Sequence, residues 1–330
     1  MDITTPSLPR LLERLASTAA LHLPVPREGG GAFEPWDGRA YDPAVLNTRM
    51  SIKSFFLPAG ETLFRFQREG ARAPFVTAPE DSGTGPAVLF GVRPCDAAGI
   101  AAVTRVFAKD KADHYFMRRR EQTAIVSVGC TAPDACCFCA SVGLCPHSEK
   151  GADLFLAPLA AGGYRVKACT PKGETLLTAI RDTLTPEKGA VAAPPAVKGP
   201  VIAADAPARL EARFADPVWA AVGEKCIGCG TCTFVCPVCH CFDIVDEKHR
   251  DKGARLRIWD ACQFERFTLH GSGHNPRAGQ PERIRQRILH KFAYLPKTDN
   301  VCGCTGCGRC VRQCPVNLDI REAVTAALGS

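Results

Sequence analysis

Cysteine is the residue type most able to carry chemistry in this chain, and eight cysteines share one spacing. The motif C-x2-C-x2-C-x3-C-P occurs twice, at Cys226, Cys229, Cys232 and Cys236 and again at Cys304, Cys307, Cys310 and Cys314. Three thiolates separated by two residues each let a tight loop surround one [4Fe–4S] cluster. Because the whole motif is repeated, a chance match is implausible, and we expect two such clusters.

The two motifs are expected to share their ligands. In proteins with two clusters of this type, the fourth cysteine of each motif ligates the other cluster. We therefore expect a first cluster on Cys226, Cys229, Cys232 and Cys314, and a second on Cys304, Cys307, Cys310 and Cys236. Each fourth cysteine should begin a helix that leads away from its loop. Structural zinc sites are the alternative, but zinc ligands usually form separated C-x2-C pairs, so the spacing favours iron–sulfur clusters.

Three further cysteines lie near the first motif. Cys239 and Cys241 follow it closely, and Cys262 stands in RIWDACQF. They supply three ligands of a further metal site if the residues between them fold back as a hairpin. Free cysteine is among the most buried residue types, so simple packing beside the clusters is the favoured interpretation. We expect His240 to lie at the surface, and we assign no role to Cys302.

The N-terminal half contains a weaker constellation. Predicted strands end at Cys95 and Cys130, and ligands in open α/β sheets bind at the carboxyl ends of strands. We expect Asp96 to cap the helix that follows Cys95. With the nearby C-x-C pair, the strand ends would make a possible third [4Fe–4S] site on Cys95, Cys130, Cys137 and Cys139. Judged by spacing alone, buried structural thiols fit these residues as well.

Periodicity places these residues on two domains. Short β-rich runs at 86–92, 123–129, 153–159 and 164–169 alternate with helical patterns, which predicts an α/β domain over residues 1–184. The stretch 185–207, rich in Pro, Ala and Gly, is predicted to be a linker. Residues 208–330 are predicted to form an α+β ferredoxin-like dicluster domain with an insertion between the two motifs.

Smaller elements of the second domain follow from the same patterns. A helix over 210–225 should lead into the first motif, and the insertion should begin with two strands joined by a turn at 251–253. A basic helix over 281–292 should bury Ile284, Ile288 and Leu289 and expose its charges to solvent. The final helix should be capped by Asp319.

Composition narrows the class of protein. The chain has 19 Cys in 330 residues, and it is long enough to fold without disulfides, so metal binding in a reducing, cytoplasmic compartment is expected. We find neither a secretory signal nor an apolar run of about eighteen residues that would span a membrane. The formal net charge is +7. Twelve thiolates around three cores of charge about +2 each would reduce it to roughly +1, which removes the main support for nucleic-acid binding.

Several longer motifs resemble one family. The runs FGVRPCDAAGI, CFCASVG, CIGCGTCTFVCPVCHCFD, WDACQFERFTLHGSGHNPR, RIRQRILHKF and CTGCGRCVRQCPVNLDI together are similar to the beta subunit of cytosolic sulfhydrogenases, a family that also includes one of the subunits of anaerobic sulfite reductase. The resemblance covers most of residues 86–325. It implies that the N-terminal site and Cys239, Cys241 and Cys262 fall in family motif positions, whereas Cys136, Cys145, Cys169 and Cys302 fall outside them. His240 stands where the family has an aromatic residue.

The resemblance implies an iron–sulfur electron carrier that works between a flavin subunit handling NAD(P)H and a catalytic redox subunit. The chain has no G-x-G-x-x-G fingerprint that joins a strand to a helix, and no Walker A loop. Catalysis is therefore expected to belong to partners, and no catalytic residue is assigned. Two alternatives remain open at this point: a self-sufficient reductase with its active site in the N-terminal half, and a non-redox protein with structural clusters.

Overall fold

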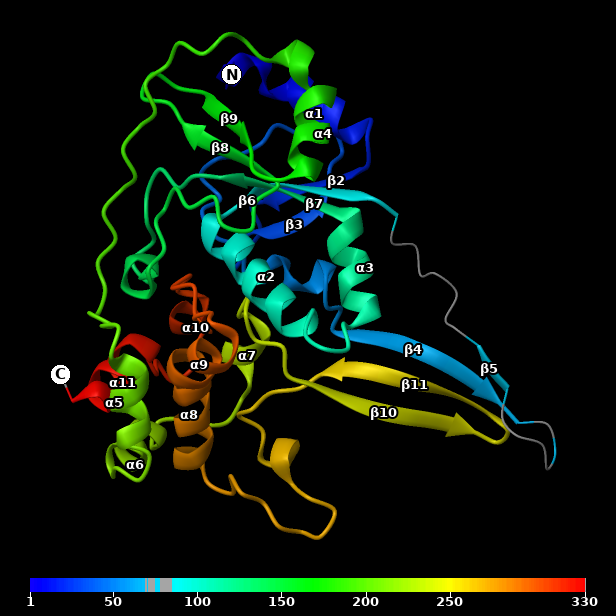
Figure 1. Cartoon of the computed structure of the whole chain (residues 1–330), viewed down its shortest axis with the longest axis vertical. Helices are drawn as coiled ribbons and strands as arrows, with labels where there is room; N and C mark the ends of the chain where they lie inside the picture. Colours follow the sequence, from blue (N-terminus) through cyan, green and yellow to red (C-terminus); the bar gives the residue numbers. More distant parts are fainter. Residues whose placement is uncertain (69, 71–74, 78–84, 330) are drawn as a thin grey trace.

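The computed structural model describes residues 1–68, 70, 75–77 and 85–329, which form two sheets and a group of helices (Figure 1). The larger sheet has seven strands in the order β1-β9-β8-β7-β6-β2-β3. Its strands are β1 (Asp2–Ile3), β2 (Ala20–Val25), β3 (Ala32–Pro35), β6 (Ala87–Val92), β7 (Thr123–Val128), β8 (Leu154–Pro158) and β9 (Tyr164–Ala168). β2, β6, β7 and β8 are parallel, and the flanking strands are antiparallel. All four strands predicted in this half are confirmed.

The central strands are apolar on both faces because helices cover both. Val88 and Val126 face a core formed with α1 (Leu8–Ala16) and α4 (Pro171–Ala179). Leu89 and Ile125 point the other way, toward α2 (Pro94–Phe107) and α3 (His114–Gln122). This alternation follows from the two-residue repeat of a β-strand, and doubly covered parallel sheets have such strands. The N-terminal half is thus a mixed α/β layer structure.

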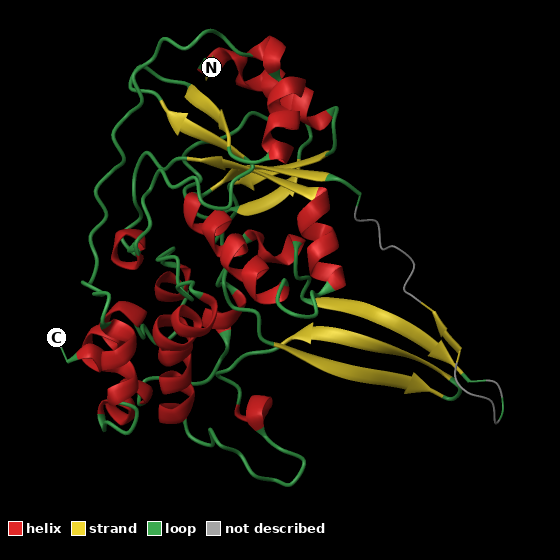
Figure 2. Cartoon of the chain, viewed as in Figure 1, coloured by secondary structure: helices red, strands yellow, loops and turns green. Residues whose placement is uncertain are grey.

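The second sheet combines strands from both halves of the chain. Its order is β10-β11-β4-β5, all antiparallel, with β4 (Gly60–Gln67), β5 (Phe75–Thr77), β10 (Phe242–His249) and β11 (Lys252–Trp259). The sheet extends away from the rest of the molecule (Figure 2). The predicted hairpin is present, but its turn lies earlier, at Arg250 and Asp251, where Arg250 has a left-handed φ of 54°. Its pairing with β4 was not predicted.

The remaining helices pack mainly on one another and around the cysteine loops. They are α5 (Ala206–Ala212), α6 (Val218–Gly223), α7 (Thr231–Phe234), α8 (Gln280–Leu289), α9 (Leu295–Asp299), α10 (Arg309–Arg312) and α11 (Ile320–Leu328). A π-helical turn, η6 (His290–Tyr294), joins α8 to α9. Short 3-10 helices are η1 (Thr5–Ser7), η2 (Ile52–Phe55), η3 (Cys139–Val142), η4 (Arg181–Thr183) and η5 (Glu265–Thr268). Ile284, Ile288 and Leu289 of α8 are buried with α5, α6 and α11, as predicted.

Two helix predictions in this half are wrong, and one cap is confirmed. The helix predicted over 210–225 is two helices, because residues 213–217 are outside both helices and Pro217 cannot continue a helix interior. The short helices α7 and α10 come before the fourth cysteines, so Cys236 and Cys314 end a helical turn and do not begin one. Asp319 does cap α11, and its carboxylate accepts the backbone N–H of Arg321 at 2.8 Å.

Residues 185–205 run along one side of the molecule between η4 and α5 (Figure 1). Along the larger sheet this segment forms isolated bridges at Thr185 and Val191 and further hydrogen bonds at Lys188, Gly189 and Ala192. Its role as a boundary between two domains stays a prediction, since β4 and β11 join the two halves elsewhere. In the part of the chain that the structure describes, every helix is too short or too polar to cross a bilayer.

Candidate metal centres

The first predicted ligand set surrounds one cavity, here called site 1. It is lined by Cys226, Cys229, Cys232 and Cys314. Three come from the loop before and within α7, and Cys314 comes from the second motif, as crossed ligation requires. Backbone and side-chain N–H groups already point at the sulfurs: Leu318 N lies 3.2 Å from Cys314 Sγ, and Gln280 Nε2 lies 3.5 Å from Cys226 Sγ.

The second predicted set, site 2, is deeper in the molecule. Cys236, Cys304 and Cys307 are buried, and Cys310 is nearby. Burial is the main cause that raises the pKa of the Cys304, Cys307 and Cys310 thiols, and the neighbouring Cys236 raises each further; for Cys310 the pKa reaches about 12. Thiolates at these positions therefore need a positive partner, such as a metal centre.

The third predicted set also lines a single cavity, site 3. Its walls include Cys95, Cys130, Cys137 and Cys139. Cys95 is the second residue of α2, which follows β6, and Cys130 follows β7, so the site lies at the carboxyl ends of two adjacent parallel strands. Cys137 and Cys139 enter from the loop that leads into η3. The structure thus brings together residues from three separate segments of the N-terminal half.

Asp96 does not cap α2, contrary to the prediction. The N-cap is Arg93, and the Asp96 carboxylate instead binds the Arg309 guanidinium through two hydrogen bonds of 2.6 and 2.7 Å. Arg309 is 0% exposed and Asp96 1%. The pair joins Asp96, the neighbour of Cys95 in site 3, to Arg309, one of the two residues between Cys307 and Cys310 of site 2. A buried bidentate pair of this kind fixes the geometry of both partners.

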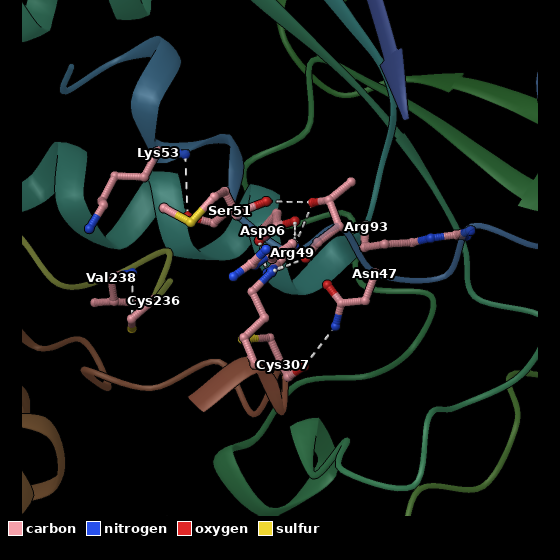
Figure 3. A network of polar contacts seen from close by, with 12 residues as sticks. Asn47, Arg49, Ser51, Lys53, Arg93, Asp96, Cys236, Val238 and Cys307 are labelled. Carbon is pink, nitrogen blue, oxygen red and sulfur yellow. Dashed lines mark hydrogen bonds and ion pairs between the residues drawn. The ribbon is translucent and has the colours of Figure 1, made fainter. Parts of the chain in front are cut away.

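Sites 2 and 3 share a wall of backbone. Gly306 and Gly308 have left-handed φ values of 62° and 75°, and a Cβ on Gly306 would lie 2.4 Å from the backbone N of Cys139. Only glycine allows this close approach. Phe138 N donates to Gly306 O at 2.8 Å, and Asn47 Nδ2 donates to Cys307 O at 2.7 Å (Figure 3).

Three buried cations lie among the cysteines. Lys53, Arg287 and Lys291 are 2%, 5% and 4% exposed. Lys53 Nζ donates to Cys239 O at 2.9 Å, Arg287 donates to Cys232 O at 3.1 Å, and Lys291 Nζ lies 3.4 Å from Cys236 Sγ. Figure 3 shows Lys53 extending toward the loop that carries Cys236. Burial alone would lower the pKa of Lys291, but the neighbouring Cys236 and Cys239 sulfurs hold it well above its ordinary value.

The prediction that the basic helix exposes its charges to solvent is wrong for these cations. Arg283, Arg287 and Lys291 recur every four residues along α8 and η6, and all three are buried. Within the described residues, none of Lys53, Arg287 and Lys291 has a carboxylate partner. An unpaired buried charge is costly, so the surroundings of sites 1 and 2 call for an anionic group. A [4Fe–4S] cluster held by four thiolates is such a group, and the residues present fit it.

The remaining cysteines are placed differently. Cys239, Cys241 and Cys262 line one more cavity with His240 and His290. His240 is partly buried and not at the surface as expected, because its ring packs edge-on against His290 at 5.7 Å between centroids. Cys145 is exposed beside site 3, and Cys302 is partly buried near Lys291. Cys169 packs against a small separate core under β8.

The spacing of the cysteines bears on the type of centre. In the described segments, no group of three or more His, Cys, Asp and Glu side chains is arranged to hold one metal ion. A four-iron cluster offers one iron to each of four thiolates, so its ligands stand farther apart than those of a single ion.

Sequence reasoning missed the polar residues of these sites. Lys53 and Asn47 lie far from every cysteine motif, and no local pattern connects them to site 2. Arg283, Arg287 and Lys291 did carry a signal, since their four-residue spacing places them on one face of a helix. That face adjoins the apolar stripe, and we read it as solvent-exposed because buried cations are rare without partners.

Comparison with known proteins supports the same interpretation. Residues 225–318 match the 4Fe-4S dicluster domain family, which accounts for two [4Fe–4S] clusters. Sulfhydrogenase 2 subunit beta of Pyrococcus furiosus is 30% identical over 328 residues, which cover 94% of this chain and 93% of that protein. No solved structure gives a significant match. With this identity along nearly the whole length, the chain belongs to the sulfhydrogenase beta subunit family.

Proposed function

We propose that the chain is an iron–sulfur electron-transfer subunit of a cytoplasmic, multi-subunit oxidoreductase. Its electrons pass between a flavin subunit that handles NAD(P)H and a catalytic redox subunit of the hydrogenase or the sulfite- or sulfur-reductase type. The similarity to a sulfhydrogenase beta subunit and the dicluster domain support this proposal. Site 3 is proposed as a third [4Fe–4S] site, with Cys95, Cys130, Cys137 and Cys139 as its ligands.

One observation carries the proposal: the three sites are contiguous, and site 2 is in the middle. Cys310, assigned to site 2, also lines the site 1 cavity. Cys307, likewise assigned to site 2, lines the site 3 cavity. A [4Fe–4S] cluster, when bound, takes up or releases one electron at a time. Three adjoining sites therefore form a continuous route through the protein.

The ends of the route reach the surface and its middle does not. Cys229 of site 1 is exposed, and Ile227, two residues before it, is 63% exposed. Cys145 is exposed at the edge of site 3. Cys236, Cys304 and Cys307 are buried. This is the arrangement needed for exchange with one partner at each end, while water is kept from the central site.

The chain's own residues hold the sites and balance their charge. The cysteines supply thiolate ligands, and backbone N–H groups such as Gly306 N, 3.4 Å from Cys304 Sγ, stabilise negative charge on sulfur. Arg287 and Lys291 offset the charge of the thiolates at sites 1 and 2. The Asp96–Arg309 pair holds the Cys95 segment of site 3 next to the Cys307–Cys310 loop of site 2.

The test is electron flow through the assembled complex. Cys229→Ala, at site 1, and Cys307→Ala, at site 2, are expected to abolish transfer from NAD(P)H to the terminal acceptor. The half-reaction of each partner with an artificial dye should remain, because these cysteines belong to the route and not to a partner's active site. Cys169→Ala is the matched control, since Cys169 lines none of the three sites, and it should retain full transfer. Loss of both half-reactions together with overall transfer would indicate a structural role and contradict the proposal.

A further inference from the structure

The β10–β11 hairpin brings together cysteines that lie outside the two repeated motifs. Cys241 directly precedes β10, and Cys262 follows β11 closely. The antiparallel register pairs Phe242 with Trp259, and Asp260 N donates to Cys241 O at 3.1 Å just beyond that pair. Closing the hairpin therefore places Cys262 beside Cys241. Together with Cys239 they line one cavity.

An imidazole completes a set of four potential ligands around this cavity. His290 lines it and is the first residue of the π-helical turn η6. Turns of this kind often mark functional sites within helices. His240 also lines the cavity, but its Nδ1 is 3.0 Å from Val238 O and its ring packs on Phe107. Among the described residues, no hydrogen bond engages either ring nitrogen of His290, whereas one ring nitrogen of His240 is engaged, so we assign His290 as the fourth ligand.

The charge around the cavity is positive. Arg287 and Lys291 line it, and Arg287 lies 3.8 Å from Cys239 Sγ. Lys53 reaches the same residue from the opposite half of the chain, at its carbonyl oxygen. Cys239 belongs to neither predicted cluster, yet two cations contact it directly. A thiolate at this position, as part of an anionic centre, explains why they are buried there.

We propose that Cys239, Cys241, Cys262 and His290 hold a fourth iron–sulfur cluster, of the [4Fe–4S] type. A single metal ion is disfavoured, because these side chains do not converge as closely as one ion requires. The site adjoins the route described above: Thr233 Oγ1 lies 3.9 Å from Cys262 Sγ, and Arg287 bridges from Cys239 to Cys232 O of site 1. Ligation by one histidine places its reduction potential above that of an all-cysteine cluster.

The proposal extends the proposed function and raises the iron expected in the loaded chain from about twelve to about sixteen atoms. The test is metal and sulfide analysis of the full chain, purified without oxygen. A Cys241→Ser/Cys262→Ser double variant should lose about four irons and four sulfides per chain relative to the wild type. Cys169→Ser, a partly buried cysteine outside every cavity named above, should lose none. Equal iron in the double variant and the wild type, or loss of zinc in place of iron, would overturn the proposal.

A second variant decides the matter where the first fails to fold. His290→Cys replaces the imidazole by a thiolate, so it should keep all of the iron and shift one cluster to a lower midpoint potential in an EPR-monitored redox titration. A titration identical to that of the wild type would exclude His290 as a ligand and refute the assignment. An iron-free wild-type chain would instead refute the proposed function as a whole. Iron in the wild type that the double variant retains would refute only the fourth site.

Discussion

The surroundings of site 3 and those of sites 1 and 2 balance charge in different ways. At site 3, Arg309 is neutralised by the Asp96 carboxylate, and Asp134 lies beside Cys136, whose N–H it accepts at 2.8 Å. Around sites 1 and 2, Arg287 and Lys291 contact carbonyl oxygens and cysteine sulfurs and no described carboxylate. The first environment keeps one buried cation without a carboxylate partner in the described residues, Arg93, which lines the site 3 cavity and donates to the carbonyl oxygens of Pro43, Val45 and Leu46. The second becomes neutral only when the thiolates are ionised and hold an anionic centre.

This difference has a consequence for electron flow. Positive charge near a cluster favours its reduced form, which carries one more negative charge, and nearby carboxylates disfavour it. Because one uncompensated cation, Arg93, lines site 3 and three lie around sites 1 and 2, we expect site 3 to have the lowest reduction potential of the three. Electrons that enter at site 3 would move downhill toward site 1.

The largest expected effect tests the paired charges beside site 3. Arg309→Met leaves the Asp96 carboxylate buried and unpaired, and should lower the free energy of unfolding by about 3–5 kcal/mol. Because the pair does not depend on iron, the loss should be similar in iron-loaded and iron-free protein, measured by anaerobic denaturant unfolding. Arg312→Met, on the same helix but in a half-exposed pair with Asp134, should cost less than about 1 kcal/mol. A cost at Arg309 as small as that at Arg312 would contradict the comparison.

A smaller effect tests the surroundings of sites 1 and 2, where the buried cations contact cysteine sulfurs and no described carboxylate. Lys291→Met removes the charged donor 3.4 Å from Cys236 Sγ. A hydrogen bond to a charged group is worth about 1.5–3 kcal/mol, so the potential of the cluster at site 2 should fall by on the order of 100 mV for a one-electron couple. An EPR-monitored redox titration measures this shift. Lys297→Met, whose side chain is 68% exposed, is the control and should leave the potential unchanged; an equal shift in both variants would show that the effect is not local.

The smallest effect concerns another carboxylate of the N-terminal half. Asp2 accepts from Arg165 Nε at 2.6 Å and from the backbone N–H groups of Lys188 and Gly189. The Arg165 hydrogen bond is the main cause that lowers the pKa of Asp2. Asp2 therefore stabilises the fold at pH values above its unfolded pKa of about 3.9, and this contribution is lost as the pH falls from there toward the folded pKa.

Asp2→Asn should accordingly lower the free energy of unfolding by about 1.5 kcal/mol at pH 7, and the difference from the wild type should narrow below about pH 4. Denaturant unfolding at pH 7 and at pH 3 measures it. Asp182→Asn, in an exposed pair with Arg10 and Arg14, is the control and should change stability little at either pH. A difference for Asp2→Asn that stays constant across this range would mean that the charge of Asp2 is not responsible.

Local patterns predicted the local parts of the structure. The four strands predicted in the larger sheet follow from runs such as 123–128. All residues of that run are buried, and all except Ser127 are apolar or β-branched. The cysteine spacing grouped the first two ligand sets, and the strand ends suggested the third; the first and the third each line one cavity of the structure. The strand predictions are confirmed because each depends on residues close together in sequence, whereas the assignment of the cysteines as cluster ligands stays a prediction.

The features that were not predicted depend on distant residues. The pairing of β4 with β11 joins Glu61 to Arg257, nearly two hundred residues apart. The two-residue alternation of a strand does not indicate which other strand it pairs with. The role of Asp96 could not be found from its position at a helix start, because its partner Arg309 belongs to the other half. Lys53 was overlooked for the same reason.

The shared sheet has a consequence for how this protein can be divided. A fragment beginning at residue 208 would contain both repeated motifs but would leave β11 as an open edge, with unpaired N–H and C=O groups where β4 now lies. It would also lack Lys53 and Asp96, which anchor the cysteine loops from outside. The ferredoxin-like part is therefore not a cassette that can be cut out and transplanted, and exchange between relatives would have to carry the whole chain.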